Sequence, residues 1–272
     1  LMVFVSAFFV FGGLVKAEPI TEAQLRAHID VLASDFFEGR KPGTTGENKT
    51  VNYIASQWQN AGLIPAAGDG QWYAPVTLVE RTPVSQSVSL TVQANGKSRL
   101  MKITDDQMVL RGIMPIGHLT QAQLVFAGYG NIAKSDHKCI NGKLAIILLR
   151  APSERKDFSK QALIDAGALG VLTIIKGKKR WQRSARRYRK GGMNLGGEGS
   201  HAPVEGIISA KLFEKIAKKA GLRAGDLIEQ ASKEGFLPVK MAVSAELVIR
   251  TDVHQFQSHN VVGKIPGKNP EA

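Results

Sequence analysis

The sequence predicts an α/β protein, and three observations support that fold class. Residues 144–149 form an uninterrupted apolar run and residues 171–175 are apolar apart from Thr173, as is typical of strands buried on both faces, and a helical apolar pattern lies between them at 158–168. Apolar residues tend to alternate over 72–92, as they do in half-buried strands. A length of 272 residues, 43% hydrophobic and 22% charged, suffices for one large core or two modest ones.

The first residues have the pattern of an export signal. Residues 3–15 are almost purely apolar, and Val15 and Ala17 are the small residues that a signal peptidase requires, so we expect cleavage after Ala17. The run is short for a bilayer span and polar residues follow it at once. An uncleaved membrane anchor is the alternative, and either way we expect a periplasmic or extracellular protein. Because the chain begins with leucine and no basic region precedes the run, we expect the reading frame to begin further upstream.

Two helices are predicted after this signal. Thr21 followed by Gln24 has the form of a capping box and predicts a short helix. The glycines and the proline of residues 35–46 exclude a continuous helix there and predict an ordered loop. A second helix is predicted from Gly46 to its stop at Gly62, and its apolar stripe is expected to pack on a sheet.

The remaining elements are predicted from strand alternation and turn residues. Asn95-Gly96 predicts a hairpin turn, and Asn141-Gly142 a second turn. Ser209 is a candidate N-cap for a helix that ends at Gly221. Further strands are predicted at 100–103, 123–129, 239–249 and 260–265.

The formal net charge of +13 is concentrated in one segment. Residues 176–190 contain nine cations and no acid, and Trp181, Ala185 and Tyr188 lie on one helical face. Lys178 to Lys190 therefore predicts a basic amphipathic helix that could contact anionic surfaces or nucleic acid. The favoured alternative is that this segment is solvated, partly mobile and protrudes from the surrounding fold. No nucleic-acid partner is expected.

Cys139 is the only cysteine, so no intrachain disulfide forms and stability must come from packing. No base is recognisable beside it, which favours an inert, partly buried residue over a reactive thiol.

Four stretches, taken in order, resemble one known arrangement. The first is Leu32-Ala33-Ser34-Asp35, Glu38-Gly39-Arg40 and Gly43-Thr44-Thr45-Gly46-Glu47, followed by Tyr53-Ile54 and Ala61-Gly62-Leu63. The next two are Phe126-Ala127-Gly128-Tyr129-Gly130 with Asn141-Gly142-Lys143, and Ala166-Gly167-Ala168-Leu169-Gly170-Val171. The last is Ser258-His259-Asn260-Val261-Val262-Gly263-Lys264-Ile265-Pro266-Gly267. The outer stretches resemble the catalytic domain of the di-zinc aminopeptidase family (aminopeptidase Y and leucyl aminopeptidase type), and the inner ones resemble the protease-associated domain inserted in many members.

The resemblance implies an incomplete zinc-exopeptidase-like catalytic domain interrupted by a protease-associated α/β insert. It implies a signal peptide at 1–17, the first part of the catalytic domain at 18–82, connecting strands at 83–119, the insert at 120–243 and a truncated catalytic sheet at 244–272. An incomplete sheet exposes edges and apolar faces, so the chain alone is expected to be marginally stable or prone to aggregation.

The resemblance also implies two zinc ions, whose ligands begin with a His-x-Asp, continue with a Glu-Glu pair and end with an acid and a histidine. These ligands are expected beyond Ala272, so no catalytic or metal residue is assigned in this chain, its substrate-binding residues stay unknown, and the chain alone is expected to be inactive. Zinc would polarise the scissile carbonyl and activate a bridging water, with a carboxylate as general base.

The histidines present offer no recognisable substitute, since they show neither His-x-x-x-His nor His-x-His; they are His28, His118, His137, His201, His254 and His259. Asp252-Val253-His254 reverses the family's first ligand motif, and on a strand both side chains would share one face, which allows a metal site. The alternative is two solvated strand residues. His259 beside Asn260 is expected to be a structural hydrogen-bonding residue.

Three functions stay open at this point. The first is the non-catalytic portion of an exported zinc aminopeptidase that acts on peptide substrates. The second is a protease-associated binding module, and the third a non-peptidase relative such as a glutaminyl cyclase. Serine-protease and nucleotide-binding motifs are absent from the sequence.

Overall fold

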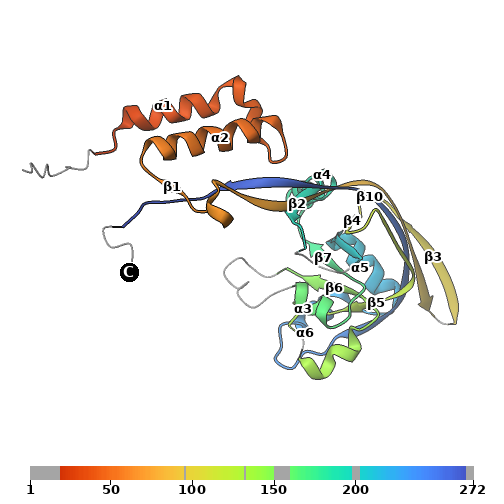
Figure 1. The fold of residues 1–272 in the computed structure, drawn as a ribbon. Helices are drawn as coiled ribbons and strands as arrows, with labels where there is room; N and C mark the ends of the chain where they lie inside the picture. The colour runs from red at the N-terminus through yellow and green to blue at the C-terminus, as the bar shows by residue number, and fades with distance from the viewer. Residues whose placement is uncertain (1–18, 95, 132, 150–159, 198–202, 268–272) are drawn as a thin grey trace, which may run out of the picture. The chain divides into compact units, whose positions relative to one another are not determined.

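The computed structural model describes residues 19–94, 96–131, 133–149, 160–197 and 203–267, and it has a mixed α/β fold (Figure 1). The predicted export signal at 1–17 lies outside the described residues. The chain divides into two compact units, of which the first holds residues up to 75 and those from 258 onward, and the second holds residues 76–257. Among the described residues, no helix is both long and apolar enough to cross a membrane.

The first unit is built from two helices and a small sheet. Its elements are α1 (Glu22–Ala33), η1 (Asp35–Arg40), α2 (Thr45–Asn60), β1 (Ile64–Pro65), η2 (Gly68–Gly70) and β11 (Gly263–Lys264), with β1 antiparallel to β11. The predicted capping box is confirmed, because Gln24 N donates to Thr21 Oγ1 at 3.3 Å and Thr21 N donates to Gln24 Oε1 at 2.9 Å. Gly62 follows α2 with a φ of 84°, as expected of a helix stop.

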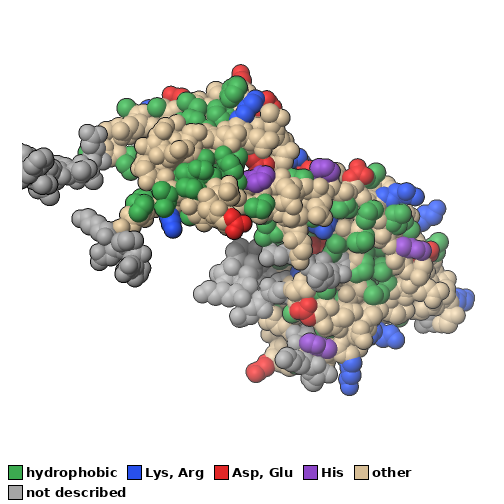
Figure 2. Space-filling view, viewed as in Figure 1, with side chains coloured by type: hydrophobic (Ala, Val, Ile, Leu, Met, Phe, Trp, Pro, Cys, Tyr) green, Lys and Arg blue, Asp and Glu red, His purple; other side chains and the backbone are tan. Residues whose placement is uncertain are grey.

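Apolar side chains of this unit remain at the surface. No residue of α1 is buried, and Leu25 and Ile29 are 53% and 62% exposed. We expected the apolar stripe of α2 to pack on a sheet. Within the described residues of the first unit, the only sheet is the two-stranded β1–β11 pair, where the Trp58 ring lies close to Gly263. Figure 2 shows hydrophobic side chains at the surface over these helices.

The second unit is organised around a nine-stranded mixed sheet in the order β3-β2-β10-β5-β6-β7-β9-β4, with β8 paired to β2. The strands β5 (Ile116–Phe126), β6 (Leu144–Leu148), β7 (Gly170–Ile175) and β9 (Val204–Ser209) are parallel to one another. The other strands are β2 (Tyr73–Ala94), β3 (Lys97–Ile103), β4 (Met108–Gly112), β8 (Gly192–Leu195) and β10 (Val239–Val261). The helices are η3 (Lys134–Cys139), α3 (Lys160–Asp165), α4 (Lys178–Lys190), α5 (Ala210–Lys219) and α6 (Ala224–Gln230).

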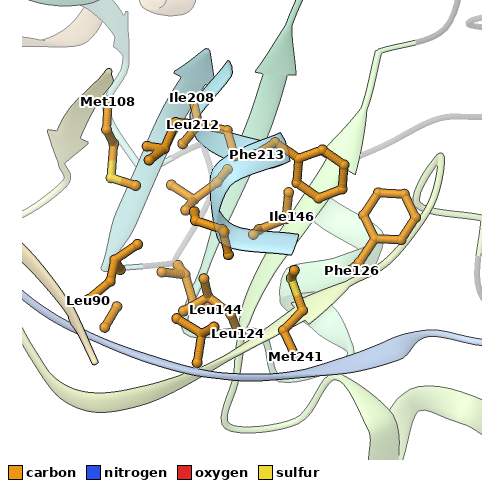
Figure 3. Packing of buried hydrophobic residues seen from close by; sticks show 14 of the residues in the cluster. Leu90, Met108, Leu124, Phe126, Leu144, Ile146, Ile208, Leu212, Phe213 and Met241 are labelled. Atoms are coloured by element: carbon orange, nitrogen blue, oxygen red, sulfur yellow. The ribbon is translucent and has the colours of Figure 1, made fainter. Parts of the chain in front are cut away.

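Helices cover both faces of the parallel strands, and β6 is buried throughout, as its apolar run predicts. On one face Leu144 and Ile146 pack with Phe126 and with Phe213 of α5 (Figure 3). On the other face Ala145 and Ile147 pack with α3, and a neighbouring cluster joins Ile175 to α4. Full burial of each such aliphatic side chain contributes about 1.5–3 kcal/mol, so this sheet is the stability core of the unit.

Two strands differ from expectation by their length. β2 runs for 22 residues and β10 for 23. The strand predicted at 239–249 is the first part of β10, and the one predicted at 260–265 covers the last residues of β10 and the separate strand β11. The units divide within these strands, and the segment 83–119 that was expected to connect domains lies inside the second unit.

Candidate functional site

The described residues do not assemble a metal site from histidines and acids. No group of three or more His, Cys, Asp or Glu side chains that could hold a metal ion occurs among them. Asp252 and His254 are both exposed on β10, and the ring of His254 stacks on Phe256 with centroids 5.5 Å apart. His118 lies on β5 and His137 on η3, and His201 lies outside the described residues.

The first and last stretches of the family resemblance meet at Glu47. Its side chain is 7% exposed, and its carboxylate accepts hydrogen bonds from three donors. The backbone N–H of Gly43 and the hydroxyl of Ser258 are two of them, and His259 N donates to Oε1 at 3.0 Å. His259 makes this contact through its backbone N–H, so the hydrogen bond does not depend on its imidazole ring.

The electrostatics of this carboxylate follow from those donors. Burial raises the pKa of Glu47, but the hydrogen bonds from Ser258, His259 and Gly43 outweigh burial and hold the pKa below its ordinary value. An ionised, fully bonded carboxylate has no proton to give and little capacity to take one. Glu47 is thus a positioning group, and it ties the 35–46 loop to the end of β10.

Gly46 allows this arrangement sterically. A Cβ at Gly46 would lie 2.2 Å from the carbonyl oxygen of Phe37 and 3.2 Å from Arg40 N. The loop can therefore fold back on the start of α2 only where residue 46 has no side chain. The local sequence around Gly46 and Glu47 does not indicate that Ser258, 211 positions further along the chain, is a hydrogen-bond partner of Glu47.

A groove lies between α1 and α2 in the first unit. It has a volume of about 470 Å³ and is lined mainly by His28, Leu32, Tyr53, Ile54, Gln57 and Trp58. His28 Nδ1 lies 2.8 Å from the hydroxyl of Tyr53, which is the main polar contact in the groove. With one histidine and no acid in its lining, it offers no metal chemistry.

The two middle stretches of the resemblance also meet one another, within the second unit. Gly142 N donates to Gly167 O at 2.8 Å, and Leu169 N donates to Lys143 O at 2.8 Å. A Cβ at Gly167 would lie 2.3 Å from Asn141 Oδ1, and its φ is 86°, so glycine is required there. Cys139, in η3 beside this junction, is a free and partly buried thiol.

The basic segment is a packed helix, which corrects the favoured expectation of a mobile excursion. Helix α4 spans Lys178–Lys190, its eight cations and the preceding Lys176 are all exposed, and Ala185 is buried. Trp181 and Tyr188 pack with Ala185 against the sheet, as their helical spacing predicts. The aromatic side of this helix is thereby used inside the fold.

Arg111 of β4 holds the end of α4 in place. It donates to the carbonyls of Arg187, Tyr188 and Gly191 at 2.5, 3.0 and 3.1 Å, and its guanidinium lies 4.3 Å from the centre of the Tyr188 ring. These donors satisfy helix carbonyls that have no partner within the helix. Burial lowers the pKa of Arg111, and nearby Tyr188 and Glu205 only partly offset that effect.

Lys160 and Glu205 complete the support of Tyr188. Lys160 Nζ lies 3.2 Å from the Tyr188 hydroxyl and 3.3 Å from Glu205 Oε2. Burial lowers the pKa of Lys160, but the interactions with Tyr188 and Glu205 outweigh it, and the pKa is raised above its ordinary value. The sequence contains no local signal for this cluster, because its members come from four separate elements.

Comparisons with known proteins were made against families, curated proteins and solved structures. No family model matches the chain, and no curated protein matches it. The fold is similar to an aminopeptidase from Aneurinibacillus sp. strain AM-1, with a TM-score of 0.43 and 19% identity over 84% of this chain and 45% of that one. It is also similar to a Peptidase M28 precursor from Shewanella amazonensis SB2B, with a TM-score of 0.34 and 12% identity over 80% of this chain. The chain spans 45% of the length of each of these structures.

Proposed function

We propose that this chain is the N-terminal portion of an exported zinc-dependent aminopeptidase that removes N-terminal residues from peptides. In this proposal the first unit is part of the catalytic domain and the second unit is a protease-associated insert. The ligands for two zinc ions would come from sequence that follows residue 272, and this chain alone would have no hydrolytic activity.

The observation that carries the proposal is the junction at Glu47. The two outer stretches of the family resemblance lie far apart in the sequence, and they are joined by hydrogen bonds from Ser258 and His259 to one buried carboxylate. A chance resemblance would give no reason for stretches so far apart to share hydrogen bonds to one buried carboxylate. The hydrogen bonds between the two stretches support the interpretation that both are parts of one domain.

A second observation supports the reading of residues 76–257 as an insert. The ends of this unit lie side by side, because Gln257 Nε2 donates to Thr77 Oγ1 at 3.0 Å. Adjacent ends allow a domain to be placed within another chain without distorting its host. The stretches that resemble the protease-associated domain also contact one another inside this unit, at Gly142 and Gly167.

The described residues do not fit the zinc ions that the proposal implies, because they bring no three potential ligands together. We therefore derive no catalytic step from this chain. What its residues do is structural: Glu47 fixes the strand segment that leads toward the C-terminus.

The test begins with the source gene beyond codon 272. We expect an open frame that soon encodes His-x-Asp and then Glu-Glu. The complete protein should release the N-terminal residue from aminoacyl-p-nitroanilides, lose that activity with a chelator and regain it with Zn²⁺.

Two results would contradict the aminopeptidase proposal. A stop codon at this point would favour a protease-associated binding module. An open frame with intact ligands whose product cyclises N-terminal glutamine, and does not hydrolyse the nitroanilides, would favour a glutaminyl cyclase.

A further inference from the structure

We propose that the outward face of α4 is a docking surface for anionic phospholipid membranes. The proposal concerns the second unit alone and does not depend on peptidase activity. It rests on the placement of cations along the helix, on what the opposite side of the helix contacts, and on how firmly the helix is held.

Four cations form a single row on this face. Lys179, Arg183, Arg186 and Lys190 are separated by four, three and four residues, which is the spacing of side chains stacked on one side of an α-helix. At a rise of about 1.5 Å per residue, the row is roughly 16 Å long. Arg180 and Arg187 flank it, and all six side chains are exposed.

The opposite side of the helix is committed to the sheet. Ala185 is 1% exposed, and Trp181 and Tyr188 pack beside it against Val109, Ile175 and Ile207. The outward face consequently has no apolar residue to insert into a membrane. Any contact through this face takes place at the level of the headgroups and by charge.

The charge of the row is not neutralised within the described part of the chain. No salt bridge found there involves a cation of α4. Arg189, which lies off the row, donates to the backbone carbonyl of Asp105 at 2.7 Å, and the nearby carboxylate of Glu205 pairs with Lys160. The row therefore remains available to external anions.

The helix also holds its cations in a fixed arrangement. Arg111 binds the last carbonyls of α4, and Lys160 bonds to the Tyr188 hydroxyl, so the helix is anchored at its C-terminal end as well as along its apolar side. A prepositioned row of charges binds an anionic surface without the entropic cost of ordering a segment first.

A membrane fits this surface better than a nucleic acid. Single-stranded nucleic acid is bound through aromatic side chains on which the bases stack, and the aromatics of α4 face inward. Recognition of a base sequence also requires side chains that enter a groove of the nucleic acid. The described part of the second unit offers no second element beside α4 for this purpose. Lipid headgroups diffuse laterally and can match a rigid straight row of cations.

The test uses vesicle flotation of the chain expected after cleavage at Ala17, so that the apolar run at 3–15 does not itself bind the vesicles. One variant removes the row by K179Q, R183Q, R186Q and K190Q. The matched control removes four exposed lysines from α5 in the same unit, by K211Q, K215Q, K218Q and K219Q. Both variants lose four charges, and glutamine keeps the helix propensity of lysine and arginine. Circular dichroism melting verifies that both remain folded.

We expect binding to phosphatidylcholine vesicles that contain phosphatidylglycerol and none to vesicles of phosphatidylcholine alone. The row variant should lower the partition coefficient at least about tenfold, since each Lys or Arg near such a surface contributes roughly fivefold. The α5 control should change it by less than about threefold, and salt near 0.5 M should abolish binding.

Three results would overturn the proposal. Equal losses in both variants would mean that only net charge matters. Binding to neutral vesicles would mean that an apolar surface is responsible. Tighter binding to a single-stranded oligonucleotide than to anionic vesicles, lost in the row variant, would assign the row to nucleic acid.

Discussion

The hydroxyl of Ser258 donates to the buried carboxylate of Glu47, 211 positions earlier in the chain. Together with the backbone donors of Gly43 and His259, it makes Glu47 the acceptor that joins the two sequence segments of the first unit. We make five predictions, which concern this junction, helix α4 and the two ends of the second unit.

Removing the carboxylate should destabilise the first unit. Glu47→Ala leaves three donors without their acceptor, and we expect a loss of about 2–4 kcal/mol in the free energy of unfolding. Ser258→Ala removes one donor only and should cost about 1 kcal/mol. Urea denaturation gives both values, and hydrogen exchange of peptides covering 41–48 and 257–262 locates the loss. Equal effects of the two variants would show that Glu47 is not the centre of the junction.

Acid should weaken the same contact. Because the pKa of Glu47 is lowered in the folded chain, its contribution to stability is complete above the unfolded pKa of about 4.3 and is lost as the pH falls through the folded pKa. Urea midpoints measured from pH 7 down to pH 3 should fall in the wild type. Glu47→Gln should be less stable at pH 7 and should show a shallower fall in acid. Parallel curves for the two proteins would contradict the assignment.

Gly46 should not tolerate a methyl group. Gly46→Ala would normally stabilise a helix such as α2, yet here its Cβ meets the carbonyl of Phe37, and we expect a loss of about 1–3 kcal/mol. Gly68→Ala is the control, because no heavy atom lies within 4 Å of its added Cβ. Thermal melting compares the two, and a stabilised Gly46→Ala would refute the close approach.

Tyr188 should control how tightly α4 is held. Tyr188→Ala removes the ring that packs with Ala185 and that Arg111 covers, so local opening should become at least about tenfold more frequent. Trypsin reports this directly, since α4 is rich in lysine and arginine. Tyr188→Phe keeps the ring and loses only the bond to Lys160, and it should be cleaved at nearly the wild-type rate.

Residues 76–257 should fold without the rest of the chain. The unit is continuous in sequence, contains the nine-stranded sheet, and has its two ends held together at Thr77 and Gln257. A single cooperative thermal transition and a dispersed NMR spectrum are the expected results. A molten product would mean that β2 and β10 need their terminal residues outside 76–257 for stability.

Local signals in the sequence were sufficient for the helix starts and the buried strands. The capping box at Thr21 and the N-cap at Ser209 are both present, with Leu212 N donating to Ser209 Oγ at 3.2 Å. The spacing of Trp181, Ala185 and Tyr188 indicated a helix with one apolar face at α4, although a solvated, mobile segment was the favoured expectation. These features depend on neighbours within one or two turns, which a single sequence displays directly.

Non-local features could not be read in the same way. The continuous length of β10 was not predicted, because its exposed residues, such as Asp252 and His254, break the apolar alternation while the backbone stays extended. The partner of Glu47 and the target of Arg111 depend on which strands meet in space. A single glutamate or arginine has the same local pattern whether it is solvated or buried against a distant residue.

The division of the first unit into two stretches of sequence also determines when it can be completed. Glu47 emerges from the ribosome early, whereas Ser258 and His259 follow after the whole second unit has been made. At about 5–20 residues per second, that interval lasts roughly 10–40 s. During it the carboxylate has no partner and the early helices have only each other. The second unit, being continuous, can fold in that time and bring the two distant segments near enough to close the junction.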